Sequence, residues 1–251
     1  MEPAEELYRA LSAGRPLAPF SIRGAPLGRE GGLRAGAGLR RRLGLSRVGR
    51  KIGFTNRALW PLYGVDGPIW GEVGAQTLIE ADAAPLAGLL EPRIEPEIAL
   101  GLIAPPAPGM DRAALARCVG WAAPALEIVQ SVYPGWRFDV DEAQAANGLH
   151  GRLKLGARAE VDPEALAETP ATLRRNGEIV ERGLGANALG GPLDALAALV
   201  AALAAEGAEP LAAGELVSTG TLTDAWTIAP GERWSAAFGP PLDAAVALAF
   251  A

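Results

Sequence analysis

The stretch IEPEIALGLI, residues 94–103, is the most informative part of the chain because its polar and apolar residues alternate as in a β-strand. Side chains at positions i and i+2 of a strand leave the same face, so Glu95 and Glu97 point to one side while Ile94 and Ile98 point to the other. The strand rise separates the two glutamate Cα atoms by about 7 Å. The stretch therefore predicts a strand with one apolar face and one face that carries two carboxylates.

A second strand-like run, ALEIVQSV at residues 125–132, places Glu127 between Leu126 and Ile128. A carboxylate in so apolar a run needs a compensating partner. If the three glutamates converge, they cannot all stay ionised without a cation, and oxygen ligands alone suit Mg²⁺, Mn²⁺ or Ca²⁺. The alternative is a solvent-facing Glu-x-Glu pair on an edge strand, which binds no metal.

Composition excludes several classes of protein. The chain has 251 residues, 49% of them hydrophobic and 21% charged, which is typical of a folded domain. A formal charge of −6 argues against a nucleic-acid-binding protein. The single cysteine, Cys118, excludes a disulfide within the chain. The acidic N-terminal stretch does not resemble a signal peptide, and the apolar run Leu193–Ala205 is too short to cross a membrane, so we expect a cytoplasmic protein.

Two helices have clear boundary signals. The segment DRAALARCVGWA begins at Asp111, a good N-cap residue. The segment GPLDALAALVAALAAEG has Pro192 near its start and Gly207 past its end. Residues 3–13 predict a short amphipathic helix, whereas the Gly/Ala/Arg-rich residues 23–44 predict a flexible surface segment or a mobile lid, with Arg40, Arg41 and Arg42 in solvent.

The remaining pattern favours an α+β fold with a mixed, largely antiparallel sheet or roll. Asn-Gly-Glu at residues 176–178 predicts a hairpin turn, and strands do not alternate strictly with helices. Neither GxGxxG nor GxxxxGK[ST] occurs. Further strand-like runs lie at residues 152–156, 171–175, 215–222, 225–229 and 242–250.

Lysine is rare in this chain. Only Lys51 and Lys154 are lysines among the 23 basic residues, which leaves 23 − 2 = 21 arginines. Lysine can release its proton near neutral pH when its surroundings favour it, and arginine cannot. A lysine that is retained against this bias suggests a position that needs a titratable amine.

An ordered set of motifs resembles the 2-keto-4-pentenoate hydratase and 4-oxalocrotonate decarboxylase branch of the fumarylacetoacetate hydrolase superfamily. The resemblance covers residues 48–251 and predicts one catalytic domain there, preceded by a small helical or flexible segment at residues 1–47. The motifs are KIGFTN at 51–56, YGVDGPIWG at 63–71, PRIEPEIALGL at 92–102, ALEIVQS at 125–131, FDVDEAQAANGLHG at 138–151, RRNGEIVERGLGANALGGPL at 174–193 and GELVSTGTLTDA at 214–225.

The resemblance implies a mixed β-roll with flanking helices, a homo-oligomer and a role in aromatic catabolism. It implies that Glu95, Glu97 and Glu127 bind Mg²⁺ or Mn²⁺, on which a small 2-oxo acid is polarised. Lys51 would bind the substrate carboxylate or shuttle a proton, and Thr219 would donate a hydrogen bond to a bound carboxylate. Gly53 would allow the backbone to approach the substrate closely.

Two positions depart from the family pattern. Where many hydratases carry an acidic residue, this chain has Ala75 and Gln76, and where they carry Ser-Ser it has Leu149 and His150. His150 either is a polar residue at the start of a strand or replaces the missing acid/base group, since histidine titrates near neutral pH. No histidine precedes it, so the His–Glu pair of the superfamily's hydrolases is absent.

Three functions remain open from the sequence. The first is a hydratase that adds water to a 2-hydroxy-2,4-dienoate. The second is a decarboxylase of a 2-oxo-dienedioate, for which Arg57 or Arg93 would bind the second carboxylate. The third is a metal-binding subunit without activity that stabilises a partner enzyme.

Overall fold

The computed structural model describes residues 1–57, 60–63 and 67–251, so residues 64–66 of the motif YGVDGPIWG lie outside the described residues. The helices are α1 (Pro3–Ser12), α2 (Gly28–Leu43), α3 (Trp60–Tyr63), α4 (Arg112–Ala116), α5 (Val140–Ala145) and α6 (Pro192–Ala205). The strands are β1 (Arg47–Gly53), β2 (Ile69–Gly74), β3 (Leu78–Ile79), β4 (Ala83–Ala84), β5 (Arg93–Leu102), β6 (Val119–Val129), β7 (His150–Leu155), β8 (Pro170–Arg175), β9 (Glu178–Leu184), β10 (Leu216–Thr221), β11 (Trp226–Thr227), β12 (Arg233–Phe238) and β13 (Ala244–Phe250).

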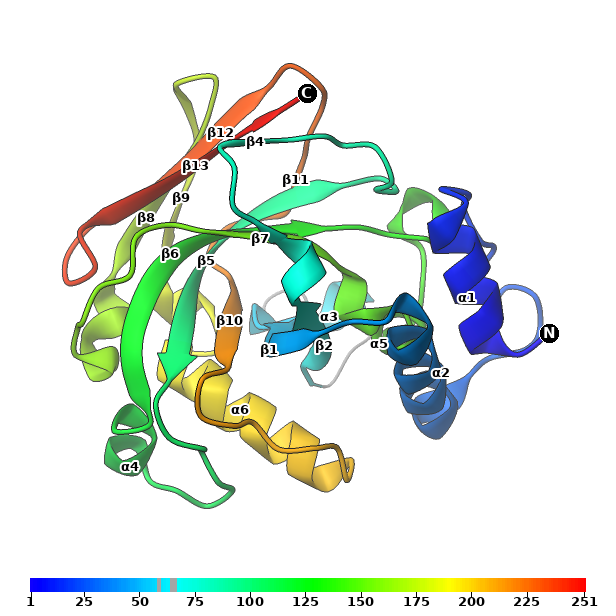
Figure 1. The fold of residues 1–251 in the computed structure, drawn as a ribbon, viewed down its shortest axis with the longest axis horizontal. Coiled ribbons are helices and arrows are strands. Elements are labelled where there is room, and N and C mark those ends of the chain that lie inside the picture. Colours follow the sequence, from blue (N-terminus) through cyan, green and yellow to red (C-terminus); the bar gives the residue numbers. More distant parts are fainter. Residues whose placement is uncertain (58–59, 64–66) are drawn as a thin grey trace.

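Two sheets form the centre of the molecule. The larger has the order β2-β1-β10-β5-β6-β7-β3, with β11 paired to β5, and the smaller has the order β4-β13-β12-β8-β9. Neighbouring strands are mostly antiparallel, but three pairs are parallel: β1 with β10, β3 with β7, and β4 with β13. Figure 1 shows the curved strands β5 and β6 at the middle of the fold, with the smaller sheet on one side and α1, α2 and α5 on the other. The predicted α+β class with a mixed sheet is confirmed.

The two faces of β5 serve different purposes. Ile94, Ile98 and Leu100 are fully buried in the main hydrophobic core, together with residues of α6 and of the smaller sheet. Burying such side chains contributes about 1.5–3 kcal/mol each. The glutamates of β5 leave the opposite face, as the alternation predicts. The core therefore fixes the strand that presents the carboxylates.

Helix α6 and the β8–β9 hairpin follow their sequence signals. Pro192 is the first residue of α6, and Gly207 beyond its end has a φ of +62°. Asn176 and Gly177 both have positive φ, which the tight turn between β8 and β9 requires. By length and composition, the segment Gly185–Ala205 could cross a membrane. Half of its apolar stretch is buried inside the protein, however, as in the core helix of a folded domain.

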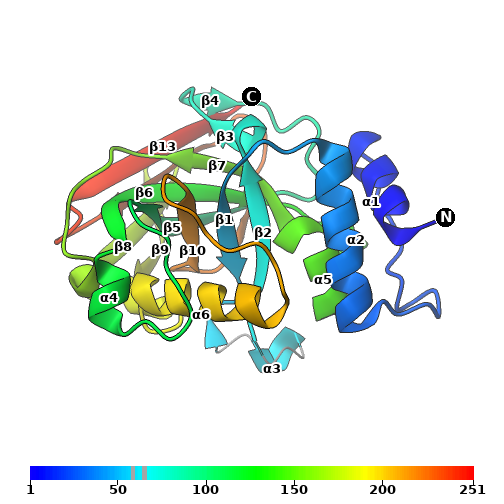
Figure 2. The same cartoon turned by 60° about the horizontal axis from the view of Figure 1, so that its bottom comes forward.

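The prediction of a flexible segment at residues 23–44 is wrong, because most of it forms α2. Figure 2 shows α2 between α1 and α5. The glycines that suggested flexibility permit close helix packing. A Cβ atom at Gly32 would lie 2.6 Å from the carbonyl oxygen of Asp141, and one at Gly36 would lie 2.8 Å from that of Gln144. Glycine therefore lets the backbones of α2 and α5 touch.

Two smaller expectations also need correction. Arg41 and Arg42 are exposed as predicted, but Arg40 is buried, with its guanidinium 4.6 Å from the ring centre of Trp70 and 3.3 Å from the Glu72 carboxylate. Asp111 does cap a helix by accepting a hydrogen bond from the Ala114 amide. That helix ends at Ala116, however, and the chain enters β6 at Val119.

Candidate metal centre and its cavity

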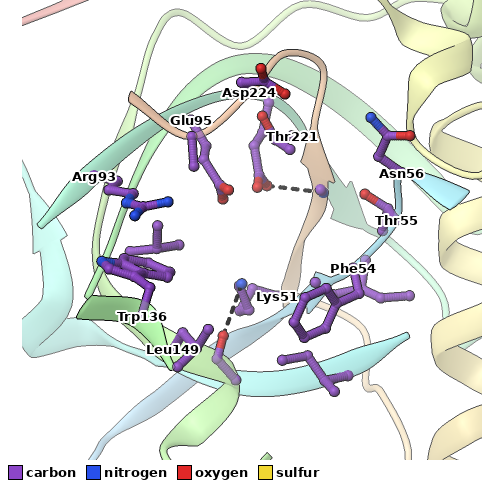
Figure 3. A pocket seen from close by; sticks show the side chains of 18 of the residues that line it. Lys51, Phe54, Thr55, Asn56, Arg93, Glu95, Trp136, Leu149, Thr221 and Asp224 are labelled. Carbon is purple, nitrogen blue, oxygen red and sulfur yellow. Dashed lines mark hydrogen bonds between the residues drawn. The ribbon is translucent and has the colours of Figure 1, made fainter. Parts of the chain in front are cut away.

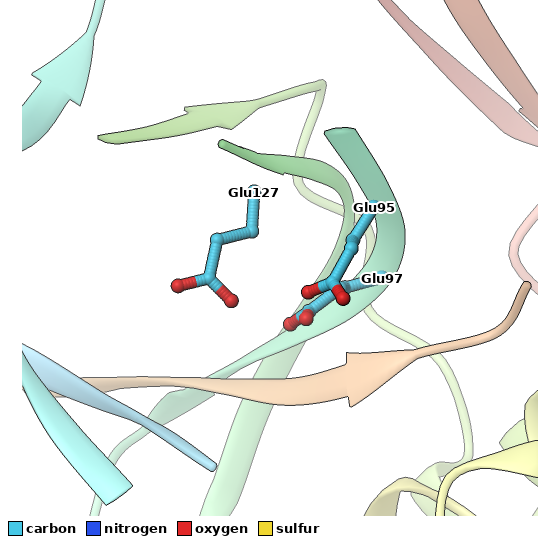
Figure 4. Close-up of side chains that lie close together, drawn as sticks. All are labelled: Glu95, Glu97 and Glu127. Atoms are coloured by element: carbon cyan, nitrogen blue, oxygen red, sulfur yellow. The ribbon is translucent and has the colours of Figure 1, made fainter. Parts of the chain in front are cut away.

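Glu95, Glu97 and Glu127 come together at the centre of the larger sheet. Glu95 and Glu127 are direct partners in the antiparallel β5–β6 ladder, and one oxygen of each glutamate lies within 4.8 Å of the others. Figure 4 shows the three carboxylates directed into one space. The structure thus places the three side chains as the strand pattern predicts, and not on a solvent-facing edge.

Each of the two fully buried carboxylates has one oxygen that is hydrogen-bonded and one that is not. Oε2 of Glu97 accepts hydrogen bonds from the Ser218 hydroxyl (2.5 Å) and the Gly220 amide (3.0 Å). Oε1 of Glu127 lies 2.8 Å from Nδ1 of His150. Among the described residues, Oε1 of Glu97 and Oε2 of Glu127 have no hydrogen-bond partner. Burying a polar atom costs free energy unless a hydrogen-bond donor or a cation compensates for the lost water.

Lys51 lies beside this cluster and is buried. It sits on β1, where the parallel pairing with β10 places it opposite Ser218. Its Nζ atom donates to the Gly148 carbonyl (3.0 Å) and lies 3.3 Å from Oε2 of Glu127. Burial alone would lower the pKa of Lys51, but the charges of the glutamates outweigh this effect and raise it.

The carboxylates titrate as a crowded group. Burial raises the pKa of Glu95 to about 7, and burial together with the neighbouring carboxylates raises that of Glu97 well above its usual range. Burial would also raise the pKa of Glu127, but the Lys51 ammonium and His150 outweigh it and lower this pKa. One ammonium does not neutralise three carboxylates. A hard divalent cation fits the donor set, because free carboxylate oxygens are its preferred ligands.

A cavity of about 300 Å³ opens onto the cluster. Figure 3 shows Glu95 and Lys51 on its walls, with Arg93 and Trp136 on one side and Thr55, Asn56 and Phe54 on the other. Gly220 is required here because it has a φ of +99° and a Cβ atom would lie 2.0 Å from the Thr55 hydroxyl. The cavity has room for a small organic acid next to the carboxylates.

The other predicted site residues differ in their placement. Gly53 lines the cavity, where a Cβ atom would lie 3.1 Å from the Lys51 ammonium. The Thr219 hydroxyl instead donates to the Ile98 carbonyl (2.7 Å) and is fully buried, so it cannot also donate to a substrate carboxylate. Thr221, two residues on, lines the cavity in its place. His150 contacts Glu127 and not the cavity, so direct acid/base contact with a substrate is not supported.

Sequence reasoning missed several cavity residues. Arg93 is not one of them, because the sequence offered it with Arg57 as a partner for a second carboxylate; it lines the cavity and shares the strand face of Glu95, two residues away. Trp136 and Phe138 are partly buried and line the cavity, and aromatic residues of this kind are as typical of a core as of a site. Asp224 follows β10 in a loop whose path no local pattern gives.

Comparison with known proteins places the chain in a family. No family model matches it. It is 34% identical to 2-keto-4-pentenoate hydratase 2 from Dechloromonas aromatica (strain RCB), over 93% of this chain and 91% of that protein. It is also 34% identical to 4-oxalocrotonate decarboxylase from Pseudomonas putida, over 74% of this chain and 71% of that protein.

A solved structure agrees with these relatives. The 4-oxalocrotonate decarboxylase from Pseudomonas putida G7, complexed with magnesium and adipate, superposes with a TM-score of 0.92 at 27% identity, covering 99% of this chain and 96% of that one. The fold is also that of a fumarylacetoacetate hydrolase family protein from Yersinia pestis CO92, with a TM-score of 0.59 at 15% identity over 80% of this chain and 92% of that one. By its sequence, the chain belongs to the family of 2-keto-4-pentenoate hydratases and 4-oxalocrotonate decarboxylases.

Proposed function

We propose that the chain is a Mg²⁺- or Mn²⁺-dependent lyase of a small 2-oxo acid, and in the first place a hydratase of a 2-hydroxy-2,4-dienoate. The observation that carries this proposal is the buried cluster of Glu95, Glu97 and Glu127 beside the Lys51 ammonium, in which Oε1 of Glu97 has no hydrogen-bond partner among the described residues and Glu95, Glu97 and Lys51 line one cavity. The names of the relatives support the substrate class.

In this proposal the three glutamates bind the cation, and Lys51 binds the substrate and transfers a proton. Glu95, Glu97 and Glu127 would hold the cation, which supplies Lewis acidity to the carboxylate and 2-oxygen of the acid. Lys51 directs one N–H to Gly148 and faces Glu127, which leaves it able to donate to a substrate oxygen in the cavity. Hydration adds the proton and the hydroxyl group of a water molecule across the terminal double bond, and we assign the donation of that proton to the Lys51 ammonium.

Apolar side chains complete the cavity. Phe54, Ile69 and Leu149 line it beside Lys51. Their burial against a substrate would displace loosely held water and strengthen the electrostatic contacts of the ammonium. A short dienoate chain, which has no charge beyond its carboxylate, matches such a surface.

The direct test is turnover of 2-hydroxypenta-2,4-dienoate with Mg²⁺, followed by loss of the dienol absorbance. Glu97→Gln should reduce the rate at least about 100-fold, because it removes a charged ligand from the cation. Glu160→Gln, an exposed glutamate, is the matched control and should leave the rate unchanged. A wild-type rate no higher than that of Glu97→Gln rejects the hydratase. Metal-dependent stabilisation without turnover of any 2-oxo acid would instead support the inactive partner subunit.

Decarboxylation of a 2-oxo-dienedioate is the second candidate, and the position of Arg93 favours it. Arg93 lines the cavity, and its buried Nε–H has no hydrogen-bond partner in the described part of the chain. Arg57, the other arginine considered, is exposed, stacks over Trp60 at 5.7 Å and is not among the described cavity residues. A second carboxylate on the substrate would satisfy the Arg93 guanidinium.

We also propose, from the family resemblance, that the chain acts as a homo-oligomer in the cytoplasm during the breakdown of aromatic compounds. The division into residues 1–47 and a catalytic domain at residues 48–251 is a proposal of the same kind. Size-exclusion chromatography with light scattering tests the assembly. Limited proteolysis tests the division, which predicts that the first cleavage falls in the link at residues 44–46, between α2 and β1.

A further inference from the structure

A chain of three hydrogen-bonding groups runs from a surface turn to the carboxylate cluster. Thr77 ends the 3-10 turn η2 (Ala75–Thr77), and its Oγ1 atom lies 2.8 Å from Nε2 of His150. Nδ1 of the same ring lies 2.8 Å from Oε1 of Glu127. The His150 side chain is only 1% exposed and the Glu127 side chain is fully buried. The imidazole is thus held from both of its nitrogens.

The direction of these hydrogen bonds follows from the donors available. Nδ1 of His150 lies 2.8 Å from a carboxylate oxygen of Glu127, and an ionised carboxylate, which is the form that binds a cation, can only accept, so Nδ1 carries a proton. Nε2 faces the Thr77 hydroxyl, which can either donate or accept. The Nδ1–H group therefore points at Oε1 of Glu127 whether the ring is neutral or protonated.

Glu127 has a competing partner. Its other oxygen, Oε2, lies 3.3 Å from the Lys51 ammonium. A carboxylate that could turn freely would share both oxygens with that ammonium and would present neither cleanly to a cation. The hydrogen bond from His150 occupies Oε1 and leaves Oε2 directed at the space that Glu95 and Glu97 also face.

Glu97, the second fully buried carboxylate, is also held by one of its two oxygens, but by different donors. Glu97 has Oε2 held by Ser218 and Gly220 of β10, and Oε1 free. Among the described residues no backbone donor is seen on Glu127. Its Oε1 atom is held by His150, and the Lys51 ammonium faces its Oε2 atom. His150 thus fixes one oxygen of Glu127, as Ser218 and Gly220 of β10 fix one oxygen of Glu97.

We propose that His150 is a positioning residue, which fixes the Glu127 carboxylate for the cation, with Thr77 fixing the ring. The proposal rests on the metal site proposed above. It differs from a direct acid/base role, because His150 lines a separate cavity of about 280 Å³ with Thr77 and Gln76 and does not reach the substrate cavity in the described structure.

The first test is the affinity for Mn²⁺, measured by titration calorimetry on the intact protein. His150→Leu should weaken Mn²⁺ binding roughly 10–100-fold, the usual cost of losing a group that orients a ligand. His150→Asn should retain most of the affinity, because its side-chain amide places an N–H near the position of Nδ1. Thr77→Val should weaken binding less than His150→Leu does. Gln76→Ala, exposed and in the same second cavity, is the control and should bind as wild type.

Turnover at saturating metal separates the two roles. A positioning residue predicts that high Mn²⁺ restores most of the kcat of His150→Leu, whereas loss of a catalytic acid or base predicts a low kcat at any metal concentration. A kcat that stays low would overturn the proposal. Equal Mn²⁺ affinity in folded His150→Leu and wild type would do so as well.

Nuclear magnetic resonance gives a readout that needs no activity. His150 is the only histidine, so a long-range ¹H–¹⁵N spectrum shows a single imidazole. The expected spectrum has a protonated Nδ1 in the metal-free protein and a shift of both ring nitrogens when Mg²⁺ is added. An unprotonated Nδ1 contradicts the proposal. If the wild-type protein binds no metal, the proposed function itself is rejected. If wild type binds metal and His150→Leu binds it equally well, only the positioning role of His150 is rejected.

Discussion

Arg93 is the cavity residue that best separates the two candidate reactions. Its guanidinium stacks over Trp136 at 4.2 Å from the ring centre, which fixes the plane of the group next to Glu95. The unpartnered Nε–H is a donor with no acceptor in the described structure. A dicarboxylate would supply that acceptor, whereas a simple dienoate would not.

Replacing Arg93 should therefore affect the two substrates unequally. A charge-assisted hydrogen bond contributes about 1.5–3 kcal/mol, so Arg93→Gln should lower kcat/KM for a 2-oxo-hexenedioate roughly 10–100-fold. Turnover of 2-hydroxypenta-2,4-dienoate should change much less. Steady-state kinetics on both substrates checks this, with Arg57→Gln as the control. Equal losses on both substrates would contradict a role in binding the second carboxylate.

Among the secondary-structure elements, α2 acts on the site through α5. The two helices meet at Gly32 and Gly36, and α5 leads directly into the turn η4 (Asn147–Leu149). That turn carries the Gly148 carbonyl that accepts from Lys51, and it ends at His150. The N-terminal helices therefore support the backbone that holds two of the groups around Glu127.

Two alanine substitutions in α2 should have opposite effects. Gly36→Ala should lower Tm, because its Cβ atom would lie 2.8 Å from the Gln144 carbonyl and push the helices apart. Gly31→Ala places its Cβ atom in ordinary contact, 3.5 Å from Leu27, and should raise Tm, since alanine favours a helix by roughly 0.5–1 kcal/mol over glycine. Thermal unfolding by circular dichroism measures both. The same sign for both variants would argue against the close contact.

For the whole molecule, the sequence predicted correctly those features that depend on local periodicity and on helix-end signals. The alternation around Glu95 gave the strand and its polar face, and the caps of α6 gave its ends. The pairing of Thr77 with His150 joins residues 73 positions apart, and no local pattern contains it. Glycines in α2 were misinterpreted because their purpose lies in a contact with α5. The bond of Thr219 to Ile98 was likewise hidden, since it depends on the register of β10 against β5.

Metal should stabilise the molecule more at high pH than at low pH. The folded-state pKa of Glu95, about 7, lies above its ordinary value of 4.5, so its contribution to stability is complete below 4.5 and is lost as the pH rises through 7. Glu97 shifts in the same direction. Without metal, Tm should thus fall between about pH 5 and pH 8, and added Mg²⁺ should raise Tm more at the higher pH. Differential scanning fluorimetry with and without EDTA measures this. A gain from Mg²⁺ that shrinks with rising pH would contradict it.

The ion pair between Lys51 and Glu127 has a consequence for the order of events at the site. Three ionised glutamates carry −3, Lys51 carries +1, and a divalent ion brings the total to zero. Before that ion arrives, an incoming organic anion meets repulsion from the carboxylates or finds them protonated and unable to chelate. We therefore expect the acid to bind more tightly once the cation is in place.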